Sequence, residues 1–274
     1  RLFLSLGKGK SEFDTQFGTF TFCFCSVLSR SPRSLGRCRR APCMAEQLPS
    51  AASRETFMPD FSAARIQMVD CQIRPSDVTR YPIIEAMLAI PREQYVPSAL
   101  RSVAYAGAHV ELGDGRVVLD PRVFGKMLDE LALSSSDLVL DIGCALGYST
   151  AVLAHVAEAV IAIESDAQMA GEAATTLAEQ GVDNAVATEG VLTEGDPAHG
   201  PYDVIMIQGG VEEMPQALLD QLKPGGRIAA IFMDGGAGQA RIGIKTGNGI
   251  AWRHAFDATA PVLNGFERAP AFQF

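Results

Sequence analysis

Three acidic residues and one small-residue turn are the parts of this sequence whose types and spacing can do chemistry. Residues 137–156, DLVLDIGCALGYSTAVLAHV, predict an apolar strand that ends near the carboxylate of Asp141, then a turn, then a helix. In the turn, Gly143, Ala145 and Gly147 allow a ligand to approach the backbone closely. A dinucleotide fingerprint requires glycine at the sixth motif position, where this chain has tyrosine, so the residues disfavour NAD.

Two further carboxylates follow at the ends of the next predicted strands. Glu164 lies 23 positions after Asp141, where a nucleoside site has the acid that accepts hydrogen bonds from ribose hydroxyls. Glu189 follows a short third strand, where a carboxylate can accept a hydrogen bond from an adenine amino group. Each acid alone is more often a solvated strand-end residue, but three together favour a cationic ligand over a polyphosphate. The residues therefore predict S-adenosylmethionine, which carries an amine and a sulfonium.

Strand and helix patterns alternate from Leu138 onward, which predicts a parallel sheet with right-handed crossovers. We expect strands at 138–142, 159–164, 185–188, 203–207 and 227–233, and helices at about 149–157, 166–180 and 211–222. An antiparallel hairpin follows, in which Asn248 and Gly249 supply the positive φ of a tight turn. The predicted fold is α/β, a doubly wound Rossmann-like sheet of the class I methyltransferase type with a C-terminal antiparallel hairpin.

The stretch ahead of the sheet predicts an N-terminal helical cap. Residues 61–96 predict two helices, because Pro75 and Pro82 each break or start a helix and Asp77 can cap the next turn. A glycine-rich stretch then predicts a short β-ribbon or loop, and residues 122–131 predict a helix with one apolar face. We expect cap and sheet to form one domain over residues 58–274.

Residues 1–57 differ in composition from the rest of the chain. They carry nine basic and four acidic residues, whereas the remainder carries 14 basic and 28 acidic residues. The segment resembles a transit peptide, or translated sequence upstream of a start at Met44 or Met58, and we expect it to be irregular or disordered. The acidic body disfavours nucleic acid as a partner. The longest apolar stretch near the start falls short of the roughly 20 residues of a membrane span.

Cysteine and histidine spacing indicates no metal site and no disulfide framework. Only Cys71 and Cys144 belong to the body of the chain. A reducing compartment is the default for such a sequence. We therefore expect a cytoplasmic protein, or an organellar one if residues 1–43 are a genuine transit peptide.

One stretch is more specific than the cofactor motifs: IIEAMLAIPREQYVPSALRSVAY, residues 83–105. With DIGCALGYSTAVLA, IESD, YDVIMIQGGVEEMP and QALLDQLKPGGRI, which follow in order, it resembles the protein-L-isoaspartate (D-aspartate) O-methyltransferase family from about Phe61 to Met233. The resemblance implies an S-adenosylmethionine-dependent carboxyl O-methyltransferase that acts on L-isoaspartyl residues of damaged proteins, which is a protein-repair reaction. It leaves the oligomeric state open. The implied cofactor-binding residues are Asp141, Gly143, Cys144, Ala145, Gly147, Glu164, Ser165, Glu189, Gly190 and Gln208.

The acceptor loop departs from the family pattern. Family members carry a serine two residues before the proline of this loop, whereas here Leu119 takes its place and Asp120 precedes the proline. Asp120 either faces the acceptor, where it would repel a carboxylate, or caps the following helix. The middle glycine of the turn is Ala145, and the family's Gly-Asp-Gly reads Thr-Glu-Gly at residues 188–190. Two alternatives therefore stand beside the repair enzyme: a changed acceptor, and a non-catalytic module that binds S-adenosylmethionine.

Overall fold

The computed structural model describes residues 60–269, and the N-terminal tail 1–57 lies outside them. Its α-helices are α1 Phe61–Met68, α2 Tyr81–Ala89, α3 Pro121–Leu131, α4 Tyr148–Val156, α5 Ala167–Glu179 and α6 Gln216–Asp220. Its strands are β1 Val110–Gly113, β2 Arg116–Val118, β3 Leu138–Ile142, β4 Ala159–Glu164, β5 Ala185–Glu189, β6 Tyr202–Val211, β7 Leu222–Asp234, β8 Ala237–Thr246 and β9 Gly249–Asp257.

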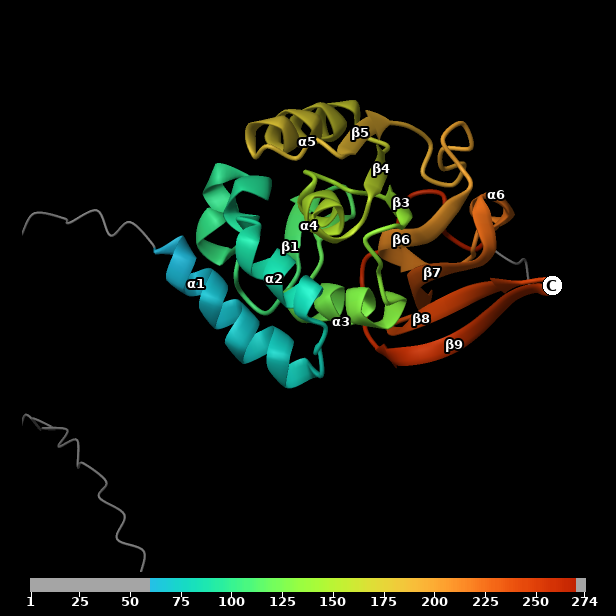
Figure 1. Ribbon diagram of the computed structural model, residues 1–274, viewed down its shortest axis with the longest axis horizontal. Helices are drawn as coiled ribbons and strands as arrows, with labels where there is room; N and C mark the ends of the chain where they lie inside the picture. The colour runs from blue at the N-terminus through green and yellow to red at the C-terminus, as the bar shows by residue number, and fades with distance from the viewer. Residues whose placement is uncertain (1–59, 270–274) are drawn as a thin grey trace, which may run out of the picture. The chain divides into compact units, whose positions relative to one another are not determined.

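Seven strands form the main sheet, in the order β5-β4-β3-β6-β7-β8-β9 (Figure 1). Strands β3 to β7 are parallel, and β8 and β9 form an antiparallel hairpin on the β7 side. The chain runs from β3 to β4 and β5 on one side and then crosses to β6 on the other. Ligands of open α/β sheets bind beside this reversal, at the carboxyl ends of the strands. The predicted fold class is confirmed.

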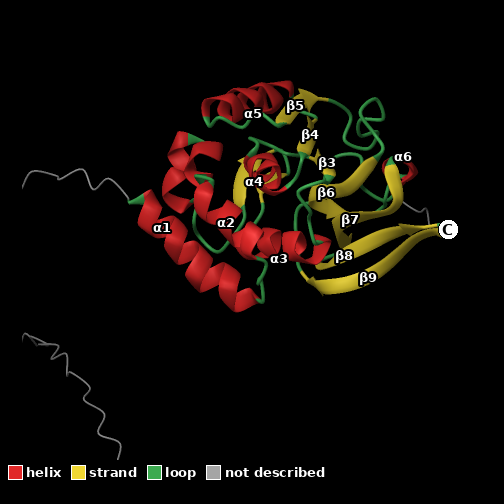
Figure 2. Cartoon of the chain, in the orientation of Figure 1, coloured by secondary structure: helices red, strands yellow, loops and turns green. Residues whose placement is uncertain are grey.

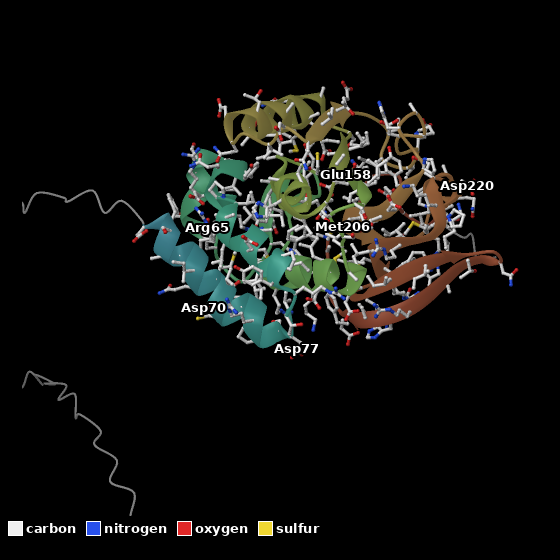
Figure 3. All side chains as sticks on the ribbon, viewed as in Figure 1. Arg65, Asp70, Asp77, Glu158, Met206 and Asp220 are labelled. Carbon is white, nitrogen blue, oxygen red and sulfur yellow. The ribbon has the colours of Figure 1, made fainter. Side chains whose placement is uncertain are left out.

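The central strands are apolar because helices cover both faces of a parallel sheet. Val139 and Leu140 of β3 and Val204 and Ile205 of β6 are all fully buried. Met206, also fully buried, lies at the centre of the molecule in Figure 3. The sheet is thus a rigid platform whose strand ends can hold polar side chains in fixed positions.

The cap helices lie together beside the sheet (Figure 2). Helix α2 packs against α4, and α3 packs against β7 and β8. The apolar face predicted for α3 is buried, and it consists of Val123, Phe124, Met127, Leu128 and Leu131. The strands β1 and β2 form a separate two-stranded ribbon ahead of α3, as the glycine-rich stretch predicted. Across residues 60–269, no helix combines the length and apolar character that crossing a membrane requires.

The prediction of a helix at residues 211–222 was wrong. Strand β6 continues to Val211, and α6 covers only Gln216–Asp220. The backbone N–H groups of Glu212 and Glu213 both donate to the carbonyl of Phe266, at 2.9 and 3.0 Å. These bonds to a distant segment hold the chain extended, so the helix begins only after the proline at 215.

Two smaller turn predictions were also wrong. Asp77 does not cap α2: it adopts a left-handed conformation with φ of 64°, and Asp129 Oδ1 of α3 instead accepts from the N–H groups of Thr79 and Arg80, at 3.2 and 3.1 Å. In the β8–β9 turn Gly249 has φ of 113°, as predicted, but Asn248 does not have positive φ.

Candidate functional site

The turn after β3 has the left-handed backbone that its small residues predict. Gly143, Ala145 and Gly147 have φ of 78°, 51° and 91°. For an alanine this conformation costs about 1–2 kcal/mol, and a hydrogen bond from Ala145 N to Glu164 Oε2, over 2.7 Å, opposes that cost. A Cβ at position 147 would also lie 3.3 Å from the Cβ of Ala173, so the close approach of α5 favours glycine there.

Asp141 is fully buried, and its carboxylate faces donors of its own chain. Oδ2 accepts from Ser149 Oγ at 2.6 Å and Thr150 Oγ1 at 2.8 Å, and Oδ1 accepts from Gln208 Nε2 at 2.8 Å. Burial raises the pKa of Asp141 to about 6, although all three hydrogen bonds lower it. In this conformation both oxygens of Asp141 are thus engaged by side chains of the chain itself.

Glu164, at the end of β4, is also fully buried and is held by several donors. Oε1 accepts from Ser165 N at 2.8 Å and Ser165 Oγ at 3.2 Å, while Oε2 accepts from Ala145 N. Arg116 on β2 completes the set with a buried ion pair to Oε2. The sequence argument did not identify Arg116, because nothing in its spacing distinguishes it from any other arginine in a glycine-rich ribbon.

Glu189 and Gly190 lie at the end of β5, the next strand in the sheet. Glu189 is paired in register with Glu164, and its side chain is exposed. Gly190 N donates to the carbonyl of Glu164 at 2.9 Å, and a Cβ on Gly190 would lie 3.0 Å from Ile163 Cγ2. The structure therefore brings the second and third acids to adjacent strand ends, as predicted.

The acceptor loop carries Leu119 and Asp120 between β2 and α3. Leu119 is 3% exposed, and Asp120 Oδ1 accepts from Arg122 N at 2.7 Å. Asp120 is thus the N-cap of α3, one of its two expected roles. Its own N–H donates to His109 Nδ1 at 2.8 Å, which ties the loop to the segment ahead of β1.

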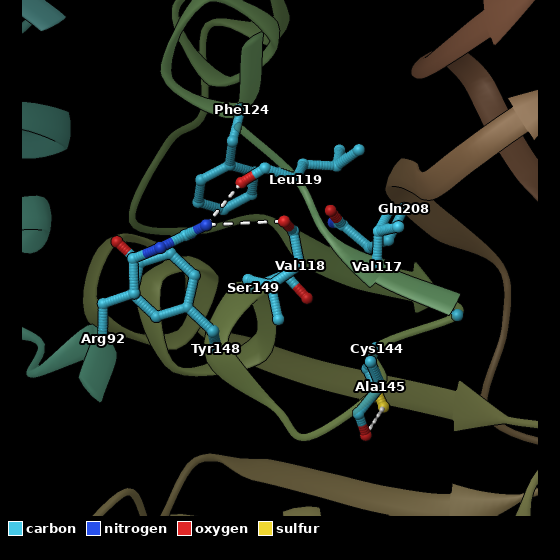
Figure 4. Close-up of a pocket in the computed structure, with 11 residues that line it drawn as sticks. Arg92, Val117, Val118, Leu119, Phe124, Cys144, Ala145, Tyr148, Ser149 and Gln208 are labelled. Carbon is cyan, nitrogen blue, oxygen red and sulfur yellow. Dashed lines mark hydrogen bonds between the residues drawn. The ribbon is translucent and has the colours of Figure 1, made fainter. Parts of the chain in front are cut away.

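Arg92 holds the acceptor loop, a role that the sequence alone did not predict. The side chain is fully buried, and Nε donates to Ala104 O at 2.7 Å. Nη2 donates to Leu119 O, also at 2.7 Å (Figure 4). Its guanidinium stacks over the ring of Tyr148, 4.7 Å from the ring centroid, and burial lowers the pKa of Arg92. Arg92 belongs to the Pro-Arg stretch within residues 83–105, so that motif has a structural role at this loop.

Three cavities are lined by residues of the expected site. The inner cavity has a volume of about 10 Å³, roughly the space of one water molecule. Its lining, much of it drawn in Figure 4, comprises Arg92, Val117, Val118, Leu119, Phe124, Gly143, Cys144, Ala145, Tyr148, Ser149 and Gln208. An outer cleft of about 600 Å³ is lined by Asp114, Arg116, Ser165, Asp166, Met169 and Asn264. Among the expected residues, the inner cavity is lined by Leu119, Gly143, Cys144, Ala145 and Gln208, and the outer cleft by Ser165. Asp120 lines a third space of about 540 Å³.

The part of the chain that matches known proteins includes the residues of this site. Positions 65–245 match the family described as Protein-L-isoaspartate(D-aspartate) O-methyltransferase (PCMT). The protein-L-isoaspartate O-methyltransferase of Methanoculleus marisnigri is 37% identical over 166 residues, which cover 61% of this chain and 76% of that relative. That of Syntrophus aciditrophicus is 37% identical over 172 residues, which cover 63% of this chain and 79% of the relative.

Solved structures agree at the level of the fold. A protein-L-isoaspartate O-methyltransferase superposes with a TM-score of 0.65 at 23% identity, covering 73% of this chain and 66% of the other. A Plasmodium falciparum structure named for the same enzyme, in complex with S-adenosyl-L-homocysteine, superposes with a TM-score of 0.63 at 16% identity, covering 76% and 99%.

Proposed function

The chain belongs to the protein-L-isoaspartate (D-aspartate) O-methyltransferase family, and from this premise we propose that it methylates the free carboxylate of L-isoaspartyl residues in proteins. The resemblance seen in the sequence is thereby confirmed. One observation supports the proposal most: the buried carboxylate of Glu164 at a strand end, directly beside the left-handed turn of residues 143–147. A ribose-binding acid needs this position.

The residues present fit S-adenosylmethionine in their chemistry. Glu164 would accept hydrogen bonds from the ribose hydroxyls, Glu189 would accept one from the adenine amino group, and Asp141 would supply negative charge near the sulfonium. When bound, the cofactor supplies an electrophilic methyl group. The turn has no side chain at Gly143 or Gly147, and the Cβ that any other residue would add at 143 would lie only 2.9 Å from Arg116 Nη2.

The acceptor side requires positioning more than acid–base chemistry. An ionised carboxylate is already a nucleophile, so the protein must hold it in line with the methyl group and exclude water. Leu119 forms an apolar wall there, and Arg92 fixes its carbonyl. Asp120 caps helix α3, so its carboxylate has a structural role that does not involve repelling the acceptor. The alternatives of a changed acceptor and of a non-catalytic module are not favoured by the family match.

Labelled methyl transfer to an isoaspartyl peptide and to its aspartyl twin tests the proposal. Turnover of the isoaspartyl peptide alone is expected. Cofactor binding without turnover of either peptide would instead support the binding module. Glu164→Gln should weaken cofactor binding in calorimetry, whereas Glu158→Gln, an exposed acid just before β4, should not.

We also propose that the protein works in a reducing compartment such as the cytoplasm. Cys71, which is exposed, and Cys144, which is buried in the site, are both free thiols. Burial raises the pKa of the Cys144 thiol well above its usual value, so it remains protonated and unreactive.

A further inference from the structure

Arg116 forms an ion pair with Glu164, the carboxylate proposed to bind the cofactor ribose. Its Nη2 donates to Glu164 Oε2, and the two side chains are 5% and 0% exposed. The same Nη2 would lie 2.9 Å from a Cβ on Gly143, so the guanidinium also covers the backbone of the turn. The oxygen available to a ribose hydroxyl therefore already has a cationic partner.

Glu164 has no spare capacity to bind both. An ionised carboxylate offers about four lone-pair sites. Oε1 accepts from Ser165 N, Ser165 Oγ and Asp166 N, and Oε2 accepts from Ala145 N and Arg116 Nη2. Three of these donors are backbone groups fixed by the turn and by the end of β4. Arg116 is the long, charged side chain that can leave.

In the closed arrangement, in which Arg116 pairs with Glu164, two hydrogen-bond donors of Arg116 lack partners in the described part of the chain. Within residues 60–269, Nε and Nη1 of Arg116 are buried and have no hydrogen-bond partner. Buried donors without partners are costly, so the ion pair is opposed by these two groups. An open arrangement would let water reach both groups and remove this cost.

The surroundings of Arg116 provide a place for it to go. Its strand belongs to a two-stranded ribbon separate from the main sheet. Arg116 also lines the outer cleft of about 600 Å³, and that cleft holds two further carboxylates, Asp114 and Asp166. Moving Arg116 outward would bring its guanidinium toward these carboxylates.

We propose that Arg116 is a gate of the cofactor site: it competes with the ribose hydroxyls for Glu164 and moves into the outer cleft when the cofactor binds. The inference rests on the proposed role of Glu164 in holding the cofactor. Because only open molecules can bind, the apparent dissociation constant exceeds the intrinsic one by the inverse of the open fraction. The association rate then levels off at high ligand concentration, where opening limits it.

Arg116→Met in the full chain tests the gate, with S-adenosylhomocysteine as the probe in calorimetry and in rapid-mixing kinetics. Methionine retains an apolar stem and cannot pair with Glu164. If about nine in ten molecules are closed, the variant should bind about tenfold more tightly. Its observed association rate should rise linearly with ligand where that of the parent protein levels off. Arg74→Met is the matched control, because it removes an arginine from an exposed ion pair with Asp70.

The outcomes separate the gate from the function. Equal affinity and equal kinetics in parent and variant would overturn the gate and leave the proposed function intact. Weaker binding by the variant would also overturn it, since Arg116 would then be a cofactor ligand. If the folded parent and variant both fail to bind, the proposed function is overturned and the gate with it. Arg116→Leu, which also has no donor for Glu164, should show the same tightening and serves if the methionine variant does not fold.

Discussion

The side-chain amide of Gln208 on β6 donates to Asp141 Oδ1 on β3 over 2.8 Å, and the two residues are 4% and 0% exposed. The bond joins the two strands on either side of the switch point, beneath the turn of residues 143–147. Gln208 is one of three donors whose hydrogen bonds stabilise the ionised form of this buried carboxylate.

Gln208→Leu should reduce the free energy of unfolding by about 1–3 kcal/mol, because it leaves a buried carboxylate oxygen without a donor. It should also raise the pKa of Asp141 further, since the bond from Gln208 lowers it. Urea unfolding at pH 7.5 measures the first effect. Gln216→Leu, on the exposed face of α6, is the control and should change little. An equal loss in both variants would assign the effect to leucine rather than to the bond.

Asp141→Asn should make the apoprotein more stable at pH 7.5. The native pKa of about 6 lies above the usual value of 3.8, so folding costs free energy once Asp141 is ionised. This cost is complete above about pH 6 and disappears as the pH falls toward 4. The shift corresponds to about 3 kcal/mol at most. The stability gap between variant and parent should therefore narrow on acidification.

Unfolding curves at pH 7.5 and pH 4.5 measure this gap. Ser149 and Thr150 can accept from the new amide, so the hydrogen bonds need not be lost. A variant that is less stable than the parent at pH 7.5 would show that the charged hydrogen bonds outweigh the burial.

Sequence reasoning was most successful where one local pattern decides the structure. Strands β3 and β4 have the predicted bounds, because apolar runs that end in acids mark buried strands of a parallel sheet. It failed where a contact with a segment distant in the sequence determines the local structure. Phe266 keeps residues 212 and 213 out of a helix, and Arg116 pairs with an acid 48 positions away. Neither contact leaves a periodic or spacing signal in a single sequence.

Affinity for S-adenosylmethionine should fall as the pH drops below about 6, while that for S-adenosylhomocysteine should fall less. Protonation removes the charge of Asp141 in this range. Only the first ligand carries a sulfonium, so only it loses that part of the Coulomb attraction. Calorimetry between pH 5 and pH 8 measures both. In Asp141→Asn the ratio of the two affinities should no longer depend on pH, and an unchanged ratio profile would exclude Asp141 as its source.

Leu119→Ser should raise turnover of an isoaspartyl peptide, because it restores a hydroxyl where family members carry serine. The gain should appear in kcat rather than in cofactor affinity, since other strand ends hold the cofactor. Leu119 is 3% exposed, so the change should also cost stability, about 2–5 kcal/mol by analogy with other large-to-small core substitutions. Steady-state kinetics and thermal unfolding measure the two effects.

Two neighbouring variants decide whether the hydroxyl itself is responsible. Val118→Ser buries a similar hydroxyl one residue earlier, at a site 7% exposed, and should lose stability without gaining turnover. Asp120→Ala removes the cap of α3 and should cost about 1 kcal/mol of stability, again with no gain in turnover. If Asp120→Ala instead raises kcat, its carboxylate faces the acceptor during the reaction despite capping the helix in the structure. If Leu119→Ser gives no gain in a folded, cofactor-binding protein, the missing serine does not limit the reaction, and the apolar wall at Leu119 suits the acceptor that this protein uses.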